Sequence, residues 1–207
     1  MADRPELVRE AYRLRHQVYC VENKYESGTA GFEIDEFDAR SRHVVIRHQR
    51  TGHVVGAARL VLPLLSAIDR SFPMQRVCEP RLLRHLPLQR AGEISRFAIS
   101  KQRRNFSGAA ISLMRLALVQ GVVRMSAEAG HTHWLALMEP SLLRLLRSNG
   151  FHFQPIGPMV EHHGVRQPVF ADVDRLLRKM AQDYREVWDF ITAGGRLWGD
   201  QGRRLAA

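Results

Sequence analysis

Residues 31–38 read Gly31-Phe32-Glu33-Ile34-Asp35-Glu36-Phe37-Asp38, and two apolar segments that each carry an arginine follow, Ala58-Arg59-Leu60-Val61 and Glu93-Ile94-Ser95-Arg96-Phe97-Ala98-Ile99. The two later segments are typical of half-buried strands. An arginine in such a strand needs a charged partner, because burying it unpaired costs several kcal/mol. We therefore expect the acidic segment to fold against these strands, so that loop carboxylates and strand arginines meet in one cleft.

Glu93 and Arg96 lie three residues apart in the second of these strands. Side chains alternate between the two faces of a strand, so in a regular strand these two would point in opposite directions. Both can face the cleft only if the strand contains a β-bulge between them. The alternative is a regular strand in which Arg96 pairs with an acid on the far face.

The spacing of apolar residues predicts an α+β fold. Leu7, Ala11, Leu14 and Val18 repeat with a helical period and predict a first helix, in which Arg15 lies about 80° round from Leu7. The other expected elements are a hairpin of strands 41–48 and 53–62, a short helix 80–86, strands 93–100, 133–138, 151–156 and 168–173, helices 107–127 and 140–149, and a C-terminal helix 174–191. This order predicts a mixed, largely antiparallel sheet with helices on its faces.

The length of 207 residues suits one core with an appendage. We expect one domain over residues 1–173 and a helical appendage over residues 174–207 packed on the same domain. There is no apolar run of eighteen residues and no apolar signal region near the first residue, so we expect no transmembrane segment and no export. Cys20 and Cys78 lack the spacing of a metal site and indicate a reducing compartment, so the expected location is cytoplasmic.

The chain is basic, with 31 Lys and Arg against 21 Asp and Glu and a formal net charge of +10. This balance favours an acidic partner: nucleic acid, an anionic membrane face or an acidic carrier protein. An alternative is that the abundance of arginine reflects genome composition. The basic residues are scattered along predicted helices without an RNA-recognition signature, a zinc finger or a basic heptad region, so we expect no nucleic-acid partner.

The ordered set of motifs resembles a known superfamily. Arg15, then Glu33-x-Asp35-x-x-Asp38, then Arg59-Leu60, then Glu93-x-Ser95-Arg96-Phe97 resemble the acyl-homoserine-lactone synthase branch of the GNAT N-acyltransferases. Three further stretches resemble the N-acyl amino acid synthases and the PEP-CTERM/exosortase-associated acyltransferases: Val18-Tyr19-Cys20-Val21-Glu22, Ser41-Arg42-His43 and residues 156–168. The resemblance implies a GNAT fold, in which a central pair of strands is splayed apart.

Two departures bear on the substrates. Lactone synthases carry Trp-bearing positions where this chain has Cys20-Val21-Glu22-Asn23, which argues against S-adenosylmethionine as the acceptor. The GNAT pyrophosphate loop, Arg/Gln-x-x-Gly-x-Gly/Ala, is only half present in Arg104-Asn105-Phe106-Ser107-Gly108-Ala109. A degraded loop suits a phosphopantetheine donor with one phosphate, as on an acyl carrier protein, more than coenzyme A. Carrier proteins are acidic, which agrees with the basic charge. The expected donor-binding residues are Arg104, Ser107 and Gly108.

The resemblance also implies roles for the cleft. Backbone N–H groups of Arg96, Phe97 and Ala98 would bind the developing oxyanion. Our candidate base is Glu33, acting through a water, and we expect Glu33→Gln to lower turnover with little loss of folding. The expected substrate-binding residues are Arg15, Asp35, Asp38, Arg59, Glu93 and Ser95. Arg15, Arg59 or Arg96 would bind the acceptor carboxylate, with Asp35 and Asp38 as their partners. The alternative is a purely structural ion network.

Two further patterns in the sequence concern a metal site and an acyl tunnel. Glu161-His162-His163 invites a metal, but neighbouring residues of a strand face opposite ways, so we expect no metal site. A set of apolar residues can form either an acyl tunnel or core: Leu113, Leu116, Leu118, Val122, Leu135 and Leu137.

The sequence thus predicts an N-acyltransferase that moves a fatty acyl group from an acyl carrier protein thioester to the α-amine of an amino acid. The thioester is a co-substrate, and no cofactor is expected to be bound permanently. The alternatives are an acyl-homoserine-lactone synthase that uses S-adenosylmethionine and a non-catalytic binder of acidic partners.

Overall fold

The computed structural model describes residues 1–26, 30–100 and 106–198. The strands are β1 (Ser41–Arg47), β2 (Val54–Val61), β3 (Ala91–Ile99), β4 (His133–Met138), β5 (Gln154–Pro155), β6 (Val160–Glu161) and β7 (Val165–Asp172). The α-helices are α1 (Pro5–Arg15), α2 (Pro80–Leu83), α3 (Gly108–Ala129), α4 (Pro140–Arg147), α5 (Val173–Asp183) and α6 (Arg185–Thr192). Short 3₁₀ turns connect several of them: Asp38–Arg40, Leu65–Arg70, Pro73–Arg76 and Leu88–Arg90.

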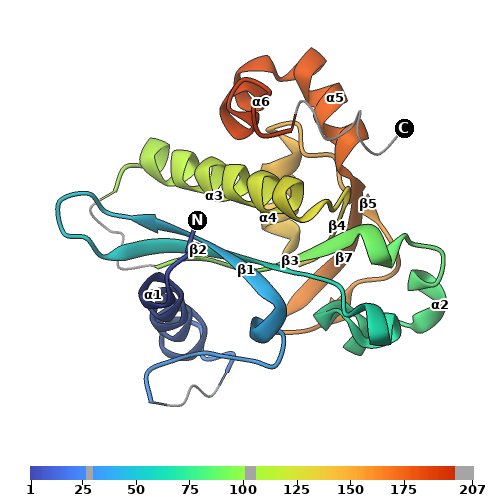
Figure 1. Ribbon diagram of the computed structural model, residues 1–207, viewed down its shortest axis with the longest axis horizontal. Helices are drawn as coiled ribbons and strands as arrows, with labels where there is room; N and C mark the ends of the chain where they lie inside the picture. Colours follow the sequence, from blue (N-terminus) through green and yellow to red (C-terminus); the bar gives the residue numbers. More distant parts are fainter. Residues whose placement is uncertain (27–29, 101–105, 199–207) are drawn as a thin grey trace.

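One mixed sheet organises the molecule. Its strand order is β1-β2-β3-β4-β7-β5, with β6 paired to β7. The pair β3 and β4 is parallel and every other pair is antiparallel. α3 covers one face of the sheet and α1 covers the other, while α5 and α6 pack outside α3 (Figure 1). The α+β class predicted from the sequence is confirmed.

The first helix follows the predicted apolar stripe. α1 begins with Pro5 in its first turn, where the missing N–H is not needed. Ala11 and Leu14 are buried against Ala57 and Ala98 of the sheet. Beyond Arg15 the chain continues as a π-helical turn, His16–Glu22. Such turns often occur at functional sites, and this one carries the chain from the helix into the cleft.

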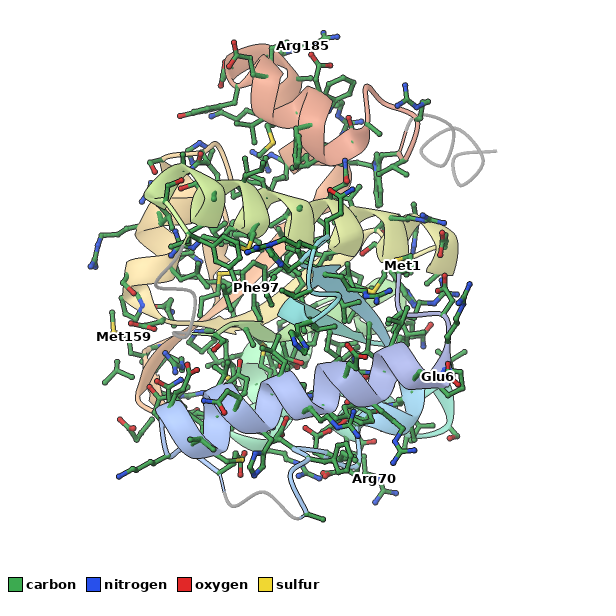
Figure 2. The ribbon with its side chains drawn as sticks, turned by 90° about the vertical axis from the view of Figure 1, so that its left-hand side faces the viewer. Met1, Glu6, Arg70, Phe97, Met159 and Arg185 are labelled. Carbon is green, nitrogen blue, oxygen red and sulfur yellow. The ribbon has the colours of Figure 1, made fainter. Side chains whose placement is uncertain are left out.

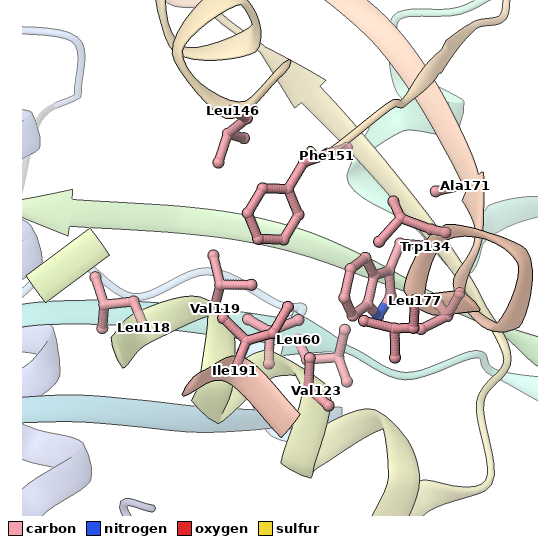
Figure 3. Packing of buried hydrophobic residues seen from close by; sticks show 14 of the residues in the cluster. Leu60, Leu118, Val119, Val123, Trp134, Leu146, Phe151, Ala171, Leu177 and Ile191 are labelled. Carbon is pink, nitrogen blue, oxygen red and sulfur yellow. The ribbon is translucent and has the colours of Figure 1, made fainter. Parts of the chain in front are cut away.

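The main core lies between α3 and the sheet, and Figure 3 shows part of it at close range. α3 approaches β1 closely at Gly121, where a Cβ would overlap the side chain of Val44. By length and composition, α3 is the one helix of the described residues that could cross a membrane. Its buried residues Leu118, Val122 and Met125 pack in this core, so α3 is a core helix of the fold.

The C-terminal region differs from the single helix predicted over residues 174–191. The chain breaks at Tyr184, whose backbone is non-helical, and forms α5 and α6. Leu177 from α5 and Ile191 from α6 are buried in the same core as α3. Both helices therefore pack on the same core as the sheet, while the boundary after residue 173 stays a prediction.

The last strands also differ in extent. The strand predicted over residues 151–156 is reduced to Gln154–Pro155, and β6 was not expected. Gly157, with φ of 158°, and Pro158 separate these two short strands. The hairpin of β1 and β2, β3, β4 and α3 lie where the sequence predicted them, within one or two residues.

The centre of the sheet is both splayed and bulged. β3 pairs with β4 only from Ala91 to Ile94, so residues 95–99 have no partner strand on that side among the described residues. On its other side β3 keeps pairing with β2, but the register shifts, because Ser95 faces Arg59 while Ala98 faces Ala57. Two residues of β3 thus lie opposite one residue of β2, which is the predicted β-bulge.

Candidate functional site

Arg15 is the centre of a buried ion network. It donates two hydrogen bonds to Asp38, from Nη1 to Oδ1 at 2.6 Å and from Nη2 to Oδ2 at 2.9 Å. Its Nε donates to Oε2 of Glu33. The side chain is 1% exposed, so these two carboxylates saturate it. Such a bidentate pair is strong and fixes orientation.

Arg59 and Arg96 complete the network from the sheet. Arg59 Nη1 lies 2.5 Å from Asp35 Oδ1 and 2.9 Å from Asp38 Oδ1, and its Nε donates to Ser95 Oγ at 3.0 Å. Arg96 donates to Glu33 Oε1 from Nε at 3.0 Å and from Nη2 at 2.8 Å, and Nη2 lies 3.2 Å from Asp35 Oδ2.

The predicted convergence is therefore present: the structure brings the three arginines and three loop acids into one cluster. The bulge decides this arrangement. Arg96 has φ of 51° and contacts Glu33 on the face that α1 covers, whereas Phe97 packs on the α3 side (Figure 2). In a regular strand Arg96 would have faced α3.

Two of the arginines cannot reach an acceptor. Arg15 and Arg59 are 1% and 0% exposed, and neither is among the residues that line the pocket described below. Their burial and the acids that already pair with them argue against the predicted contact with an acceptor carboxylate. Arg96 does line the pocket, and its guanidinium lies 5.4 Å from the ring centre of Tyr19.

Glu33 is held as a carboxylate. Burial opposes its ionisation, but hydrogen bonds from Arg15 and Arg96 outweigh burial and lower its pKa. A base must be able to accept a proton near the working pH, and a doubly bonded carboxylate of low pKa does not. These contacts argue against the predicted base, and they suit Glu33 to holding Arg96 in place.

Glu93 has the opposite environment. It is 1% exposed, accepts a hydrogen bond from the Met74 N–H at 2.9 Å, and burial raises its pKa to about 7. Glu93 and Ser95 share a face of β3 and both line the pocket. A buried carboxyl that titrates near neutrality beside a pocket is a candidate general base. The sequence could not reveal this, because the shift depends on tertiary burial.

A pocket of about 480 Å³ opens where β3 and β4 separate. Its polar end holds Glu93, Arg96, His162, His163 and Arg166. Its apolar end lies on the α3 side of the sheet and is formed by aromatic and aliphatic side chains, namely Val119, Val122, Trp134, Leu142, Leu146, Phe151 and Phe153. Figure 3 shows the Phe151 ring beside Leu146 and Val119 in this region. The pocket thus joins the two faces of the sheet and has the size of a small-molecule site.

The apolar residues predicted to form either an acyl tunnel or core lie in different environments. Val122 and Leu137 line the pocket. Leu118 and Leu135 are fully buried in core clusters and do not line it. Leu116 packs against the main core, and Leu113 is exposed. The sequence missed most of the apolar end, because Trp134, Phe151 and Phe153 come together only through the packing of β4 and the segment after α4.

His162 and His163 are further pocket residues that sequence reasoning missed. The sequence predicts that they alternate along a strand, but they form the turn between β6 and β7, where His163 has φ of 55°. Their rings stack with centres 4.2 Å apart, and His163 Nε2 lies 3.0 Å from Glu26 Oε1. Among the described residues no group of three or more potential ligands could hold a metal ion.

The expected donor loop is only partly described. Arg104 lies outside the described residues. Ser107 caps α3, where its side chain accepts a hydrogen bond from the Ala110 N–H at 3.2 Å, and Gly108 is exposed with open space around its α-carbon. Both residues are thus at an accessible helix N-terminus, and their role in donor binding stays a prediction.

Comparisons with known proteins agree with this architecture. Residues 14–114 match the model of the acetyltransferase (GNAT) domain. The fold is similar to the acyl-homoserine lactone synthase LasI (TM-score 0.64, 20% identity, covering 84% of this chain and 89% of LasI). It is also similar to BjaI, a CoA-dependent acyl-homoserine lactone synthase (0.63, 20%, covering 93% and 82%).

A third similar structure is FeeM, an N-acyl amino acid synthase from uncultured soil microbes (TM-score 0.60, 13% identity, covering 84% of this chain and 95% of FeeM). No curated protein matches the chain. At these identities the likenesses establish the fold, which is the GNAT fold with a splayed strand pair expected from the motifs.

Proposed function

We propose that the protein is an N-acyltransferase that transfers a fatty acyl group from the thioester of an acyl carrier protein to the α-amine of an amino acid. The observation that carries this proposal is the pocket at the β3–β4 splay, which joins an apolar end to an ionisable end. A fatty acyl chain fits the first, and an amine that must lose a proton fits the second.

The donor would enter with its acyl tail in the apolar end. Burial of a methylene group contributes roughly 0.8 kcal/mol, so an apolar end of limited volume would select for chain length. The thioester would then lie beside residues 95–98, where β3 has no strand partner toward β4. Backbone N–H groups at the bulge, from Arg96 to Ala98, lie where β3 has no β4 partner and are suited to bind the oxyanion.

In the proposed transfer the amine attacks the thioester directly, without an acyl-enzyme intermediate. The neutral amine forms a C–N bond to the thioester carbonyl carbon, and the C–S bond breaks to release the pantetheine thiol. Glu93 takes the proton from the attacking amine, directly or through a water, and then gives it to the leaving thiolate, so that the free thiol is released and Glu93 returns to its carboxylate form. A base with a pKa near 7 suits this step. No nucleophilic enzyme residue is needed, and Ser95 is already bonded to Arg59.

The choice of carrier protein as the donor rests on charge. The chain has a formal net charge of +10, and exposed arginines such as Arg144 and Arg147 lie on α4, beside the pocket residues Leu142 and Leu146. A basic surface favours an acidic carrier protein. BjaI is described as CoA-dependent, so acyl-CoA is the donor to compare.

The experiment gives purified protein an acyl carrier protein thioester, a mixture of the amino acids and S-adenosylmethionine, and follows products by mass spectrometry. An N-acyl amino acid with release of the carrier thiol supports the proposal. An acyl-homoserine lactone would establish the lactone synthase alternative instead. No thiol release with any acceptor, from carrier protein or CoA donors, would favour a non-catalytic binder.

A further inference from the structure

We infer that Arg166 and His162, on the hairpin of β6 and β7, form the subsite that binds the α-carboxylate of the acceptor amino acid. This inference rests on the proposed function, because it names how that acceptor is held. The motif that contains these residues has no role in the chemistry described above.

The three arginines of the ion network are poorly placed to bind the acceptor carboxylate. Arg15 is buried and has a carboxylate partner on each of its three nitrogens. Arg59 is buried too, with two carboxylates on Nη1 and Ser95 Oγ on Nε. Arg96 borders the pocket, but its Nε and Nη2 are both bonded to Glu33. Arg59 Nη2 has no hydrogen-bond partner, but it is buried and Arg59 does not line the pocket. At Nε and Nη2 of Arg96 a new carboxylate would have to displace the buried Glu33, which costs more than displacing an exposed carboxylate.

Arg166 is held differently. Its Nη2 donates to the backbone oxygen of His163 at 2.6 Å, which fixes the guanidinium against the turn. Its Nη1 lies 3.5 Å from Glu139 Oε2, and the Glu139 side chain is 57% exposed while that of Arg166 is 14% exposed. A long ion pair to an exposed carboxylate is weak. An incoming carboxylate can therefore replace Glu139 and gain the geometry of a guanidinium fork.

His162 supplies the second contact. It lines the pocket, its ring stacks on His163, and His163 in turn stacks on Tyr25 with ring centres 5.6 Å apart. Burial, with the neighbouring His163, Arg96 and Arg166, lowers the pKa of His162 to about 4, so the ring is neutral near neutral pH. A neutral imidazole still donates one N–H, which can bind a carboxylate oxygen.

The position of the hairpin fits the geometry of an amino acid. The amine and the carboxylate of an α-amino acid share one carbon, so the carboxylate subsite must border the same end of the pocket as the base. Arg166, His162 and Glu93 all line the pocket, and Arg96 lies close enough to both Glu93 and His162 for its positive charge to favour a lower pKa in each. Gln167 fixes the base of the hairpin, since its Nε2 donates to the backbone oxygens of Gly157 and Pro168.

The test compares an acceptor amino acid with its carboxamide, which keeps the amine and lacks the negative charge. With one acyl donor at saturation, the wild-type protein should favour the amino acid, and Arg166→Gln should raise the KM for the amino acid by roughly tenfold or more. The KM for the carboxamide and for the donor should stay close to the wild-type values. Arg185→Gln, at an exposed position of α6, is the matched control and should change none of these constants.

His162→Phe gives a second measurement, because it keeps the ring stack and removes the N–H. It should also raise the KM for the amino acid and leave that of the carboxamide unchanged. A wild-type protein that acylates both acceptors equally well, or an Arg166→Gln protein that keeps the preference, would overturn the inference while leaving the proposed function intact. If the wild-type protein acylates no amino acid and no carboxamide, the proposed function fails and the inference fails with it.

Discussion

Arg96 donates two hydrogen bonds to Glu33, 2.8 and 3.0 Å long, from a residue whose own backbone is left-handed. A non-glycine residue with positive φ costs on the order of 1–3 kcal/mol and persists where its surroundings fix it. Here the ion pairs of Arg96 fix this backbone conformation and with it the bulge. Residues 96–98 consequently make no backbone pairing with β4. The network and the proposed oxyanion site are thus two consequences of one local distortion.

Replacement of Glu33 by glutamine should destabilise the protein. The change removes the carboxylate that Arg15 and Arg96 share, and breaking a buried ion pair from one side costs about 3–5 kcal/mol. Urea unfolding measures the loss. This differs from the prediction made from sequence, which expected little effect on folding, and the reason is that Glu33 contacts two buried arginines.

Asp189→Asn is the control, because Asp189 pairs with Arg185 on the exposed surface of α6, and its effect should stay within about 0.5 kcal/mol. A Glu33→Gln protein as stable as that control would contradict the structural role given to Glu33.

Replacement of Glu93 by glutamine should abolish the rise of activity with pH. If Glu93 is the base, wild-type kcat/KM rises as the carboxyl loses its proton through a pKa of about 7. The variant should lack this limb and be slower by roughly 10²- to 10⁴-fold. The measurement is kcat/KM of both proteins between about pH 5 and pH 9. A variant whose kcat/KM still rises with pH through about 7 would show that Glu93 is not the base.

The same variant should behave differently in unfolding. Burial raises the pKa of Glu93 above its value of 4.5 in the unfolded chain, so the folded state binds the proton more tightly. The stability from this group is present below about pH 4.5 and is lost as the pH rises through about 7. Glutamine stays neutral, so at about pH 8 Glu93→Gln should be at least as stable as the wild-type protein.

Replacement of Leu142 by phenylalanine should shift the donor preference to shorter chains. Leu142 lines the apolar end of the pocket, and its neighbour Leu143 packs on the core without lining it. Exclusion of two methylene groups would cost about 1.6 kcal/mol, or roughly a tenfold drop in kcat/KM for a donor that fills the chamber. Leu143→Phe is the control, and equal chain-length profiles for the two variants would place the acyl chain elsewhere.

The KM for an acyl carrier protein donor should rise with salt. Added salt screens the attraction between a basic enzyme and an acidic carrier within a Debye length of about 8 Å near physiological ionic strength. The same acyl group on free pantetheine has no carrier surface to attract, so its KM should be nearly independent of salt. Parallel salt profiles for the two donors would show that carrier docking is not electrostatic.

The sequence was sufficient for those features that follow from a local requirement. Arg59 and Arg96 in apolar strands demanded acids, and the acid segment before the hairpin could supply them. A common cleft for Glu93 and Arg96 required a bulge, because side chains alternate along a regular strand. The hairpin of β1 and β2, together with α3, followed from period and turn residues alone.

Other features depend on tertiary placement and could not be predicted. Glu33 and Glu93 are both glutamates, and only packing shows that two arginines hold the first and a dry environment surrounds the second. His162 and His163 looked like strand residues, since nothing in their neighbours signals the left-handed turn. The apolar end of the pocket joins residues from α3, β4 and α4, so no single stretch of sequence reveals it.

The short ladder between β3 and β4 has one more consequence. If acyl transfer takes place in the gap, the new amide has its hydrocarbon tail on one side of the sheet and its headgroup on the other. The product then spans the sheet through the gap between β3 and β4. It can dissociate only when the tail has moved out of the apolar end and past the bulge. Longer tails would make departure the slow step of the cycle, and a burst of product in the first turnover would reveal it.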